Sequence, residues 1–143
     1  KVYYGDGTRL DILHSAGAHH ARLIIIAVND REASLRIAQL AKAEFPLVPV
    51  LARAYDREEA LKLVHAGADY HIRETFESAL VLGEHALGVL GKTPEEAAEL
   101  IAEFRLRDAD RFALELVGGL YAGRPLIHGN LHQPTPTPAQ GTT

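Results

Sequence analysis

The sequence has 143 residues, 47% of them hydrophobic and 24% charged, which is typical of one globular domain with a single core. Its net charge of −4, with no stretch that gathers Lys and Arg, argues against a nucleic-acid partner, and the lack of cysteine excludes disulfides and thiolate metal sites. The longest apolar run, residues 23–28, is far shorter than the ~20 residues needed to cross a bilayer.

The chain opens with the segment KVYYGDGTRLDIL, in which residues 1–4 predict a strand that leads into a Gly-Asp-Gly turn. Met is absent from the sequence, including position 1, so we expect this chain to be part of a longer protein. Thr8 and Asp11 predict the start of a short helix, and Gly17 predicts its end.

Residues 23–28 form a continuous apolar, β-branched run, which predicts a strand covered on both faces. Asp30 predicts the cap of a following helix that ends before Pro46. Residues 47–52 predict a second strand of this kind. Because Pro49 lacks a backbone N–H, this strand is expected near the edge of the sheet.

The pattern of strand and helix then repeats. Asp56 followed by Glu59 predicts another helix start, Gly67 predicts the end of that helix, and residues 68–72 predict a short strand. Strands separated by single helices predict an α/β fold with a doubly wound parallel sheet.

Two long helices are expected after the sheet, outside its alternating pattern. The first covers residues 74–90, and the second begins with Thr93-Pro94-Glu95-Glu96, a strong helix start. We expect both helices to pack against a partner. The expected organisation is residues 1–91 for the sheet portion, 92–123 for a C-terminal helix that makes partner contacts, and 124–143 for a disordered tail rich in Pro, Gly, Gln and Thr.

Polar loops follow the expected strands, at the edge of a doubly wound sheet where ligands bind. They are Gly5-Asp6-Gly7-Thr8, Asn29-Asp30 and Arg53-Ala54-Tyr55-Asp56. Small residues let the backbone approach a flat ring, an Asp or Asn can bond to a base or ribose, and an Arg can pair with a phosphate. Ordinary turn and cap chemistry explains each loop taken alone, so the three have to be considered together.

Metal and catalytic chemistry are not favoured. The adjacent His19 and His20 do not face the same way and no His-Glu-x-x-His spacing is present, so we expect no metal site. The Gly-x-Ser-x-Gly motif is absent, and carboxylates such as Asp11 and Asp30 lie at expected helix starts. We therefore expect a protein that is not an enzyme.

Four segments carry a resemblance to a known family, in this order: VYYGDGTRLDILHSAGA, ARLIIIAVND, VPVLARAYD and AGADYHIRETFESALVLG. Together they resemble the RCK domain (also called KTN or TrkA-N-like) of bacterial potassium transport systems, most of all that of Kef-type glutathione-gated potassium efflux systems. The resemblance covers roughly residues 1 to 122, and its most discriminating part is the stretch RETFE at Arg73 to Glu77.

The resemblance implies a Rossmann-like fold whose first strands are missing. In that family a strand, a Gly-x-Gly-x-x-Gly loop, a helix and a second strand with an acidic end come first, and none of them is in this sequence. Residue 1 then corresponds to the third strand. We expect the chain to hold half of a nucleotide site.

The resemblance also implies nucleotide-binding roles for the polar loops. The turn at 5–8 matches one that lies beside the adenine, with Gly7 where Ala is usual. Asn29 and Asp30 match a loop close to ribose and phosphate, and Arg53 matches a basic residue after the next strand. The implied ligand is AMP or NAD(H). The implied nucleotide residues are Gly5, Asp6, Gly7, Thr8, Asn29, Asp30 and Arg53.

A second site, for glutathione or its adducts, is implied by the same resemblance. Arg73 matches an Arg that helps to bind glutathione at the dimer interface, Glu74 belongs to the same motif, and Asp108 stands where the family has Asn. An Asp repels a carboxylate ligand that an amide would accept, and it can instead form an ion pair with Arg73 that closes the site. Another signal, or none, is then the alternative.

The implied function is a non-enzymatic, ligand-sensing regulatory domain of a potassium efflux (K+/H+ antiport) or related cation transport protein. Its implied partners are a second copy of the chain and the membrane-embedded transporter domain of the same polypeptide, at the cytoplasmic face of the inner membrane. Two alternatives stay open. One is a receiver-like signalling domain, which would need a Lys where Arg53 stands, and the other is an interaction scaffold that has lost its ligand.

Overall fold

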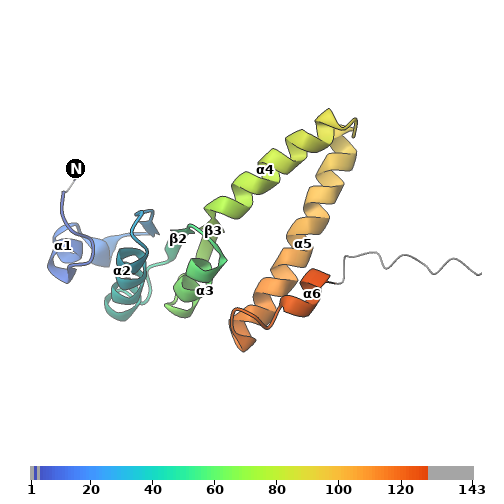
Figure 1. Ribbon diagram of the computed structural model, residues 1–143. Coiled ribbons are helices and arrows are strands. Elements are labelled where there is room, and N and C mark those ends of the chain that lie inside the picture. The colour runs from blue at the N-terminus through green and yellow to red at the C-terminus, as the bar shows by residue number, and fades with distance from the viewer. Residues whose placement is uncertain (1, 3, 129–143) are drawn as a thin grey trace, which may run out of the picture.

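The computed structural model describes residues 2 and 4–128 as a small parallel sheet with helices, followed by a long helical hairpin (Figure 1). The elements in chain order are α1 (Leu10–Ser15), η1 (Ala18–His20), β1 (Ile24–Ile26), α2 (Arg31–Glu44), β2 (Val50–Ala54), α3 (Arg57–His65), β3 (Tyr70–Arg73), α4 (Glu74–Val89), α5 (Pro94–Gly118) and α6 (Arg124–His128).

The described sheet has the order β1-β2-β3, and both strand pairs are parallel. This confirms the predicted parallel α/β fold. The strand expected at 1–4 includes residues 1 and 3, which lie outside the described residues. The expected edge position of the second strand is wrong. Pro49 comes directly before β2, so its missing N–H removes no hydrogen bond between the strands. Its carbonyl oxygen accepts a hydrogen bond from Ile24 N at 2.9 Å.

One face of the sheet carries the core. Helices α2 and α3 pack there, around side chains from β1, β2 and both helices. Among the buried residues are Ile26, Ile37, Ala38, Val50, Ala52, Ala54, Ala60 and Leu63. Residues of the other parity point away from this core. Ile25 is 67% exposed and Tyr70 60% exposed, so the prediction that residues 23–28 are covered on both faces is wrong for the described structure.

Capping residues and glycines in the sequence predicted several helix ends correctly. The Asp30 side chain accepts a hydrogen bond from Ala33 N at 2.8 Å, and the Asp56 side chain accepts one from Glu59 N at 3.0 Å, as the expected caps require. Gly17 and Gly67 have φ values of 85° and 98°, in the left-handed region that favours glycine. The turns that follow α1 and α3 were therefore predictable from these two glycines.

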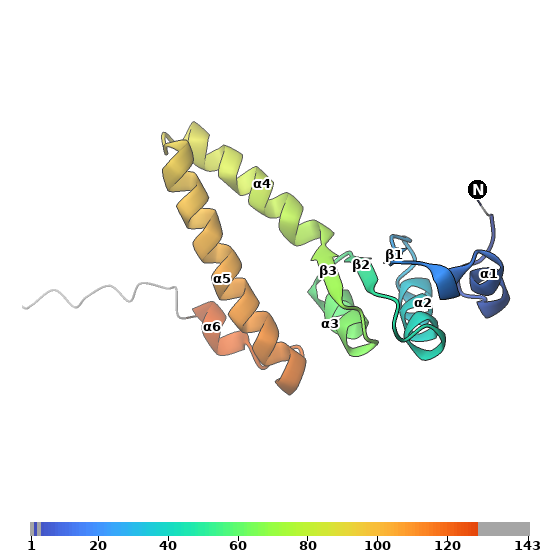
Figure 2. The ribbon, with the colours of Figure 1, turned by 180° about the vertical axis from the view of Figure 1, so that it is seen from behind.

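Helices α4 and α5 form a hairpin, here called the helical arm, that projects from the end of β3 and returns past α3 (Figures 1 and 2). Thr93 and Glu96 form the predicted capping box of α5, with Pro94 at its first position. In residues 2 and 4–128 no helix combines the length and the apolar character that spanning a bilayer requires.

The returning part of α5 docks on the sheet domain. Phe112 is buried in the core next to α3 and the sheet, and the ring nitrogens of His65 lie 2.8 Å from the Leu61 carbonyl oxygen and 3.0 Å from that of Leu116. The second half of α5 is thus part of the folded domain.

The disorder expected for residues 124–143 is wrong for the part that the structure describes. Residues Arg124–His128 form α6, which packs against α5. Pro125 favours a helix start because its φ is already fixed near the helical value, and the Arg124 guanidinium lies 4.6 Å from the Tyr121 ring centroid. Residues 129–143 lie outside the described residues.

Candidate functional site

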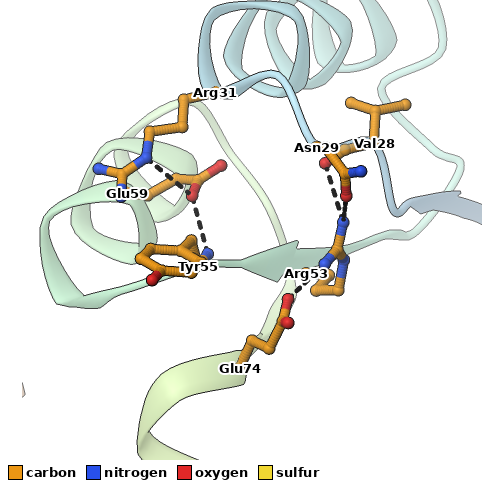
Figure 3. A pocket seen from close by; sticks show the side chains of 7 residues that line it. All are labelled: Val28, Asn29, Arg31, Arg53, Tyr55, Glu59 and Glu74. Atoms are coloured by element: carbon orange, nitrogen blue, oxygen red, sulfur yellow. Dashed lines mark hydrogen bonds and ion pairs between the residues drawn. The ribbon is translucent and has the colours of Figure 1, made fainter.

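A pocket lies at the carboxyl ends of β1 and β2, where α2 and α3 begin (Figure 3). We call it the carboxyl-end pocket. Its lining residues are Val28, Asn29, Arg31, Arg53, Tyr55, Glu59 and Glu74. The N-termini of α2 and α3 lie at this edge, and the positive partial charge of a helix N-terminus favours an anion.

Arg53 is the central cation of the carboxyl-end pocket. Its Nη2 donates to Asn29 Oδ1 at 2.5 Å and to the carbonyl oxygens of Ala27 and Val28 at 3.3 and 3.2 Å. Its Nη1 donates to Glu74 Oε2, so that the guanidinium joins the β1 loop to the start of α4 (Figure 3). Arg53 is thereby held in place by groups from two segments, the loop after β1 and the first turn of α4.

The opposite side of the pocket is formed by Arg31, Tyr55 and Glu59. Glu59 is buried and accepts a hydrogen bond from Tyr55 N at 2.8 Å, with Arg31 Nε 3.9 Å from the same oxygen. Arg31 also donates to Asp56 at 2.8 Å. Burial alone would raise the pKa of Asp56, but the hydrogen bond from Glu59 N–H and the contact with Arg31 hold this pKa below its ordinary value.

The first turn of α4 is fixed to the end of β2. Besides the ion pair between Glu74 and Arg53, Thr75 donates twice to the Tyr55 carbonyl oxygen, from Oγ1 at 2.9 Å and from N at 3.1 Å. The helical arm therefore starts at the rim of the carboxyl-end pocket.

A second group of charges lies between the sheet and α5, and we call it the buried charge cluster. Its members are Arg57, Arg73, Asp108, Arg111 and Glu115. Asp108 accepts from both Arg57 and Arg73, and Glu115 accepts from Arg57 at 3.0 Å and from Arg111 at 2.8 Å. Three cations and two carboxylates thus connect α3, β3 and α5.

Aromatic rings surround this cluster. The Arg73 guanidinium lies 4.1 Å from the Phe76 ring centroid and 5.4 Å from that of Phe112, and His71 stacks on Phe112 at 4.7 Å. Burial, followed by the positive charge of Arg73, lowers the pKa of His71. Glu115 is 0% exposed, so Arg57 and Arg111, rather than water, stabilise its buried carboxylate.

The structure brings some predicted site residues together and leaves others apart. Asn29, Arg53 and Glu74 line the carboxyl-end pocket, and the adjoining Arg73 forms with Asp108 the ion pair considered from the sequence. Glu74 was expected in the second site, but its side chain lies in the first. Arg73 ends β3 and Glu74 begins α4, so these two neighbours connect the buried charge cluster to the carboxyl-end pocket.

The remaining predicted residues do not line this pocket. Asp30 acts as the cap of α2. In the turn at 5–8, Asp6 Oδ1 accepts from Thr8 N at 2.9 Å and from Thr8 Oγ1 at 2.7 Å, which lowers the pKa of Asp6. A Cβ on Gly5 would lie 2.9 Å from a methyl carbon of Ile12, and one on Gly7 would lie 3.2 Å from Ile37. The turn packs against α1 and α2.

Sequence reasoning missed four charged residues that the structure makes important. Arg31 and Arg57 each follow a capping Asp in the repeated triplet Asp-Arg-Glu, a signal that both begin helices at the same edge of the sheet. Their side chains differ in direction, since Arg31 lines the pocket and Arg57 pairs with α5. Arg111 and Glu115 follow Asp108 at spacings of three and seven residues, which places all three on one face of a helix. That spacing could have indicated a buried polar face of α5.

Metal chemistry finds no support in the described residues, since residues 2 and 4–128 hold no group of three or more His, Asp or Glu side chains placed to share an ion. The rings of His14, His19 and His20 lie close together, but their arrangement provides no such site.

Comparisons with known proteins agree with this picture. The TrkA-N domain family matches residues 1–74. A glutathione-regulated potassium-efflux system protein from Haemophilus influenzae is 38% identical over 139 residues, which are 92% of this chain and 22% of that protein. The chain spans about a fifth of the length of this relative.

Two solved structures are similar in fold. The Kef C-terminal domain of Shewanella denitrificans in an AMP-bound form superposes with a TM-score of 0.77 at 36% identity, over 81% of this chain and 73% of that one. The GsuK RCK domain superposes with a TM-score of 0.56 at 30% identity, over 59% of this chain and 18% of that one. These matches confirm the Rossmann-like fold and the resemblance seen in the sequence, and they favour it over a receiver.

The buried charge cluster generates a stability prediction. Replacing Glu115 with Gln removes the carboxylate partner of Arg111 and one of the two carboxylate partners of Arg57, which keeps only Asp108. We therefore expect the free energy of unfolding to fall by about 3 kcal/mol in urea denaturation. The matched control is Glu103→Gln, an exposed partner of Arg107 on the same helix, for which a change under about 1 kcal/mol is expected. Equal effects of both variants would contradict a structural role for the cluster.

Proposed function

Since this chain belongs to the TrkA-N domain family, we propose that it is a ligand-sensing regulatory domain of a potassium-efflux or related cation transport protein. The observation that carries the proposal is the carboxyl-end pocket, in which Arg53 and Asn29 lie at the strand ends beside two helix N-termini. Such a domain acts by binding its ligand better in one conformation than in another, and it needs no catalytic chemistry.

We propose that the carboxyl-end pocket binds the phosphate and ribose of AMP or NAD(H). The Kef C-terminal domain that resembles this chain is in an AMP-bound form, which favours AMP. Arg53 is the cation suited to the phosphate, Asn29 supplies an amide for polar contacts, and Asp30 and the turn at 5–8 remain proposed contacts for ribose and adenine. Glu59 and Glu74 balance the positive charges of Arg31 and Arg53 in this pocket.

The glutathione-type site is proposed at Arg73, with a restriction that Asp108 imposes. The efflux protein from Haemophilus influenzae is described as glutathione-regulated, which supports such a ligand for this family member. In this chain Asp108 accepts from both guanidinium nitrogens of Arg73 and is only 11% exposed. A carboxylate ligand would have to displace this internal carboxylate, so we propose that the chain binds glutathione weakly.

The helical arm is proposed as the contact to a second copy of the chain and to the transporter domain of the same polypeptide, at the cytoplasmic face of the inner membrane. An apolar groove runs between α4 and α5, lined by residues that include Phe76, Leu80, Leu87, Leu100 and Phe104. α4 is apolar around much of its surface while few of its residues are buried, which is typical of a helix that is covered in an assembly. The groove of one copy suits the arm of another.

An interaction scaffold without a ligand is the second candidate. It is favoured by one observation: both arginines proposed to bind ligands, Arg53 and Arg73, already have carboxylate partners within the chain. The two functions differ in whether AMP and glutathione bind at all.

Arg53→Gln tests the nucleotide site. A charge-assisted hydrogen bond to phosphate contributes roughly 1.5–3 kcal/mol, so we expect AMP affinity, measured by calorimetry on the native polypeptide, to fall at least about tenfold. Arg105→Gln is the control, because Arg105 pairs with Glu77 and does not line the carboxyl-end pocket. If AMP binds neither the wild type nor the control, the scaffold function is favoured. If Arg53→Gln binds AMP as well as the control does, the site is wrongly placed.

Asp108→Asn tests the restriction on glutathione. The amide removes the repulsion and frees Arg73, so we expect glutathione to bind at least about tenfold more tightly than to the wild type. Asp110→Asn, an exposed change on the same helix, should leave glutathione binding unchanged. An added Arg73→Gln change should remove the gain. Wild-type affinity for glutathione in a folded Asp108→Asn variant would contradict the restriction.

A further inference from the structure

Two neighbouring residues at the junction of β3 and α4 reach in different directions. Arg73, the last residue of β3, pairs with Asp108 of α5. Glu74, the first residue of α4, pairs with Arg53 in the carboxyl-end pocket. The junction therefore touches both the pocket and the buried charge cluster through adjacent side chains.

The two ion pairs differ in how easily they exchange. Asp108 is 11% exposed and held by both Arg57 and Arg73, so removing it would leave two cations without their partner. Glu74 is 45% exposed and pairs with Arg53 alone among the described residues. Water and ions reach this second pair, and its net contribution to stability is small. Of the two ion pairs at the junction, the one between Glu74 and Arg53 is therefore the easier for another anion to replace.

Arg53 does not depend on Glu74 for its position. Its Nη2 is bound to Asn29 Oδ1 and to the carbonyl oxygens of Ala27 and Val28, which belong to the β1 loop. The guanidinium would stay at the strand ends if the carboxylate left, with Nη1 free to donate to another anion. The cation is thus built into the sheet edge, while its present partner belongs to the arm.

Glu74 and a bound phosphate are incompatible partners for Arg53. Both are anionic, and a phosphate monoester carries about −1.5 to −2 charges near neutral pH. Glu74 lines the same pocket, so an anion on Arg53 would lie beside its carboxylate and repel it. Phosphate binding and the contact between Glu74 and Arg53 therefore oppose each other.

From this geometry we infer that Glu74 is an internal competitor for the anion site at Arg53, and that a phosphate ligand releases the first turn of α4 by displacing it. The inference rests on the proposed nucleotide function, and it adds a way in which nucleotide binding changes the contacts of α4. In this inference the ion pair between Arg73 and Asp108 stays in place. The contacts that break are those of Glu74 and Thr75 with β2. By linkage, whatever releases Glu74 must also strengthen phosphate binding.

Glu74→Gln tests the competition with AMP as the probe. The amide keeps the size of the side chain but removes its charge, so we expect the native polypeptide to bind AMP about tenfold more tightly, a difference of about 1.4 kcal/mol. Glu77→Gln is the matched control. Glu77 also lies in the first turn of α4 and pairs with an arginine, but that partner is Arg105 on α5. Its AMP affinity should equal that of the wild type.

A second measurement follows the first turn of α4 directly. The Thr75 amide donates to the Tyr55 carbonyl oxygen, so its hydrogen exchange reports whether the turn is docked. We expect faster exchange at residues 75–78 in the wild type with saturating AMP, and in Glu74→Gln without AMP, than in the wild type alone.

The outcomes separate this inference from the function on which it rests. Equal AMP affinity of the wild type and Glu74→Gln overturns the competition but leaves the nucleotide site intact. AMP-induced protection of residues 75–78 overturns the release. If AMP binds neither protein, the nucleotide function fails and the inference fails with it.

Discussion

The structure depends most on the burial of two carboxylates, Asp108 and Glu115, between arginines from α3, β3 and α5. A buried charge is tolerated only when it is paired and hydrogen-bonded, so α5 can dock in one way: with Asp108 between Arg57 and Arg73, and with Glu115 against Arg57. This requirement fixes the returning half of the helical arm on the sheet. The apolar contact of Phe112 adds to it, but the charges set the register.

The same arginines connect this docking to the edge of the sheet where a ligand would bind. Arg57 follows the cap of α3, and Arg73 ends β3, directly before the residue that reaches Arg53. Two groups of polar contacts, one from Asn29 through Arg53 to Glu74 and one from Arg73 through Asp108 and Arg57 to Glu115, are thus joined by the peptide bond between Arg73 and Glu74. In a regulatory domain such a connection gives a ligand a physical route to a helix that contacts a partner, provided that the ligand favours one arrangement of it.

Sequence patterns predicted the parts of the structure that local chemistry decides. The caps Asp30 and Asp56, the capping box at Thr93 and the parallel strands follow from residue type and spacing, and all are present. The exposure of Ile25, the central position of β2 and the carboxylates buried on α5 could not be predicted, because they depend on which elements pack together. The interior partner of Arg73 was foreseen only because Asp108 departs from the family pattern.

The central claim is that a phosphate at Arg53 displaces Glu74 and releases α4 from the end of β2, while α5 stays docked. A distance measurement between α4 and the sheet domain tests it most directly. These 143 residues contain no cysteine, so Glu44→Cys on α2 and Val89→Cys at the tip of α4 can carry a single pair of spin labels, diluted with unlabelled protein to isolate distances within one chain. The account predicts that saturating AMP shifts the distance distribution between the two labels. An identical distribution with AMP bound and absent would contradict it.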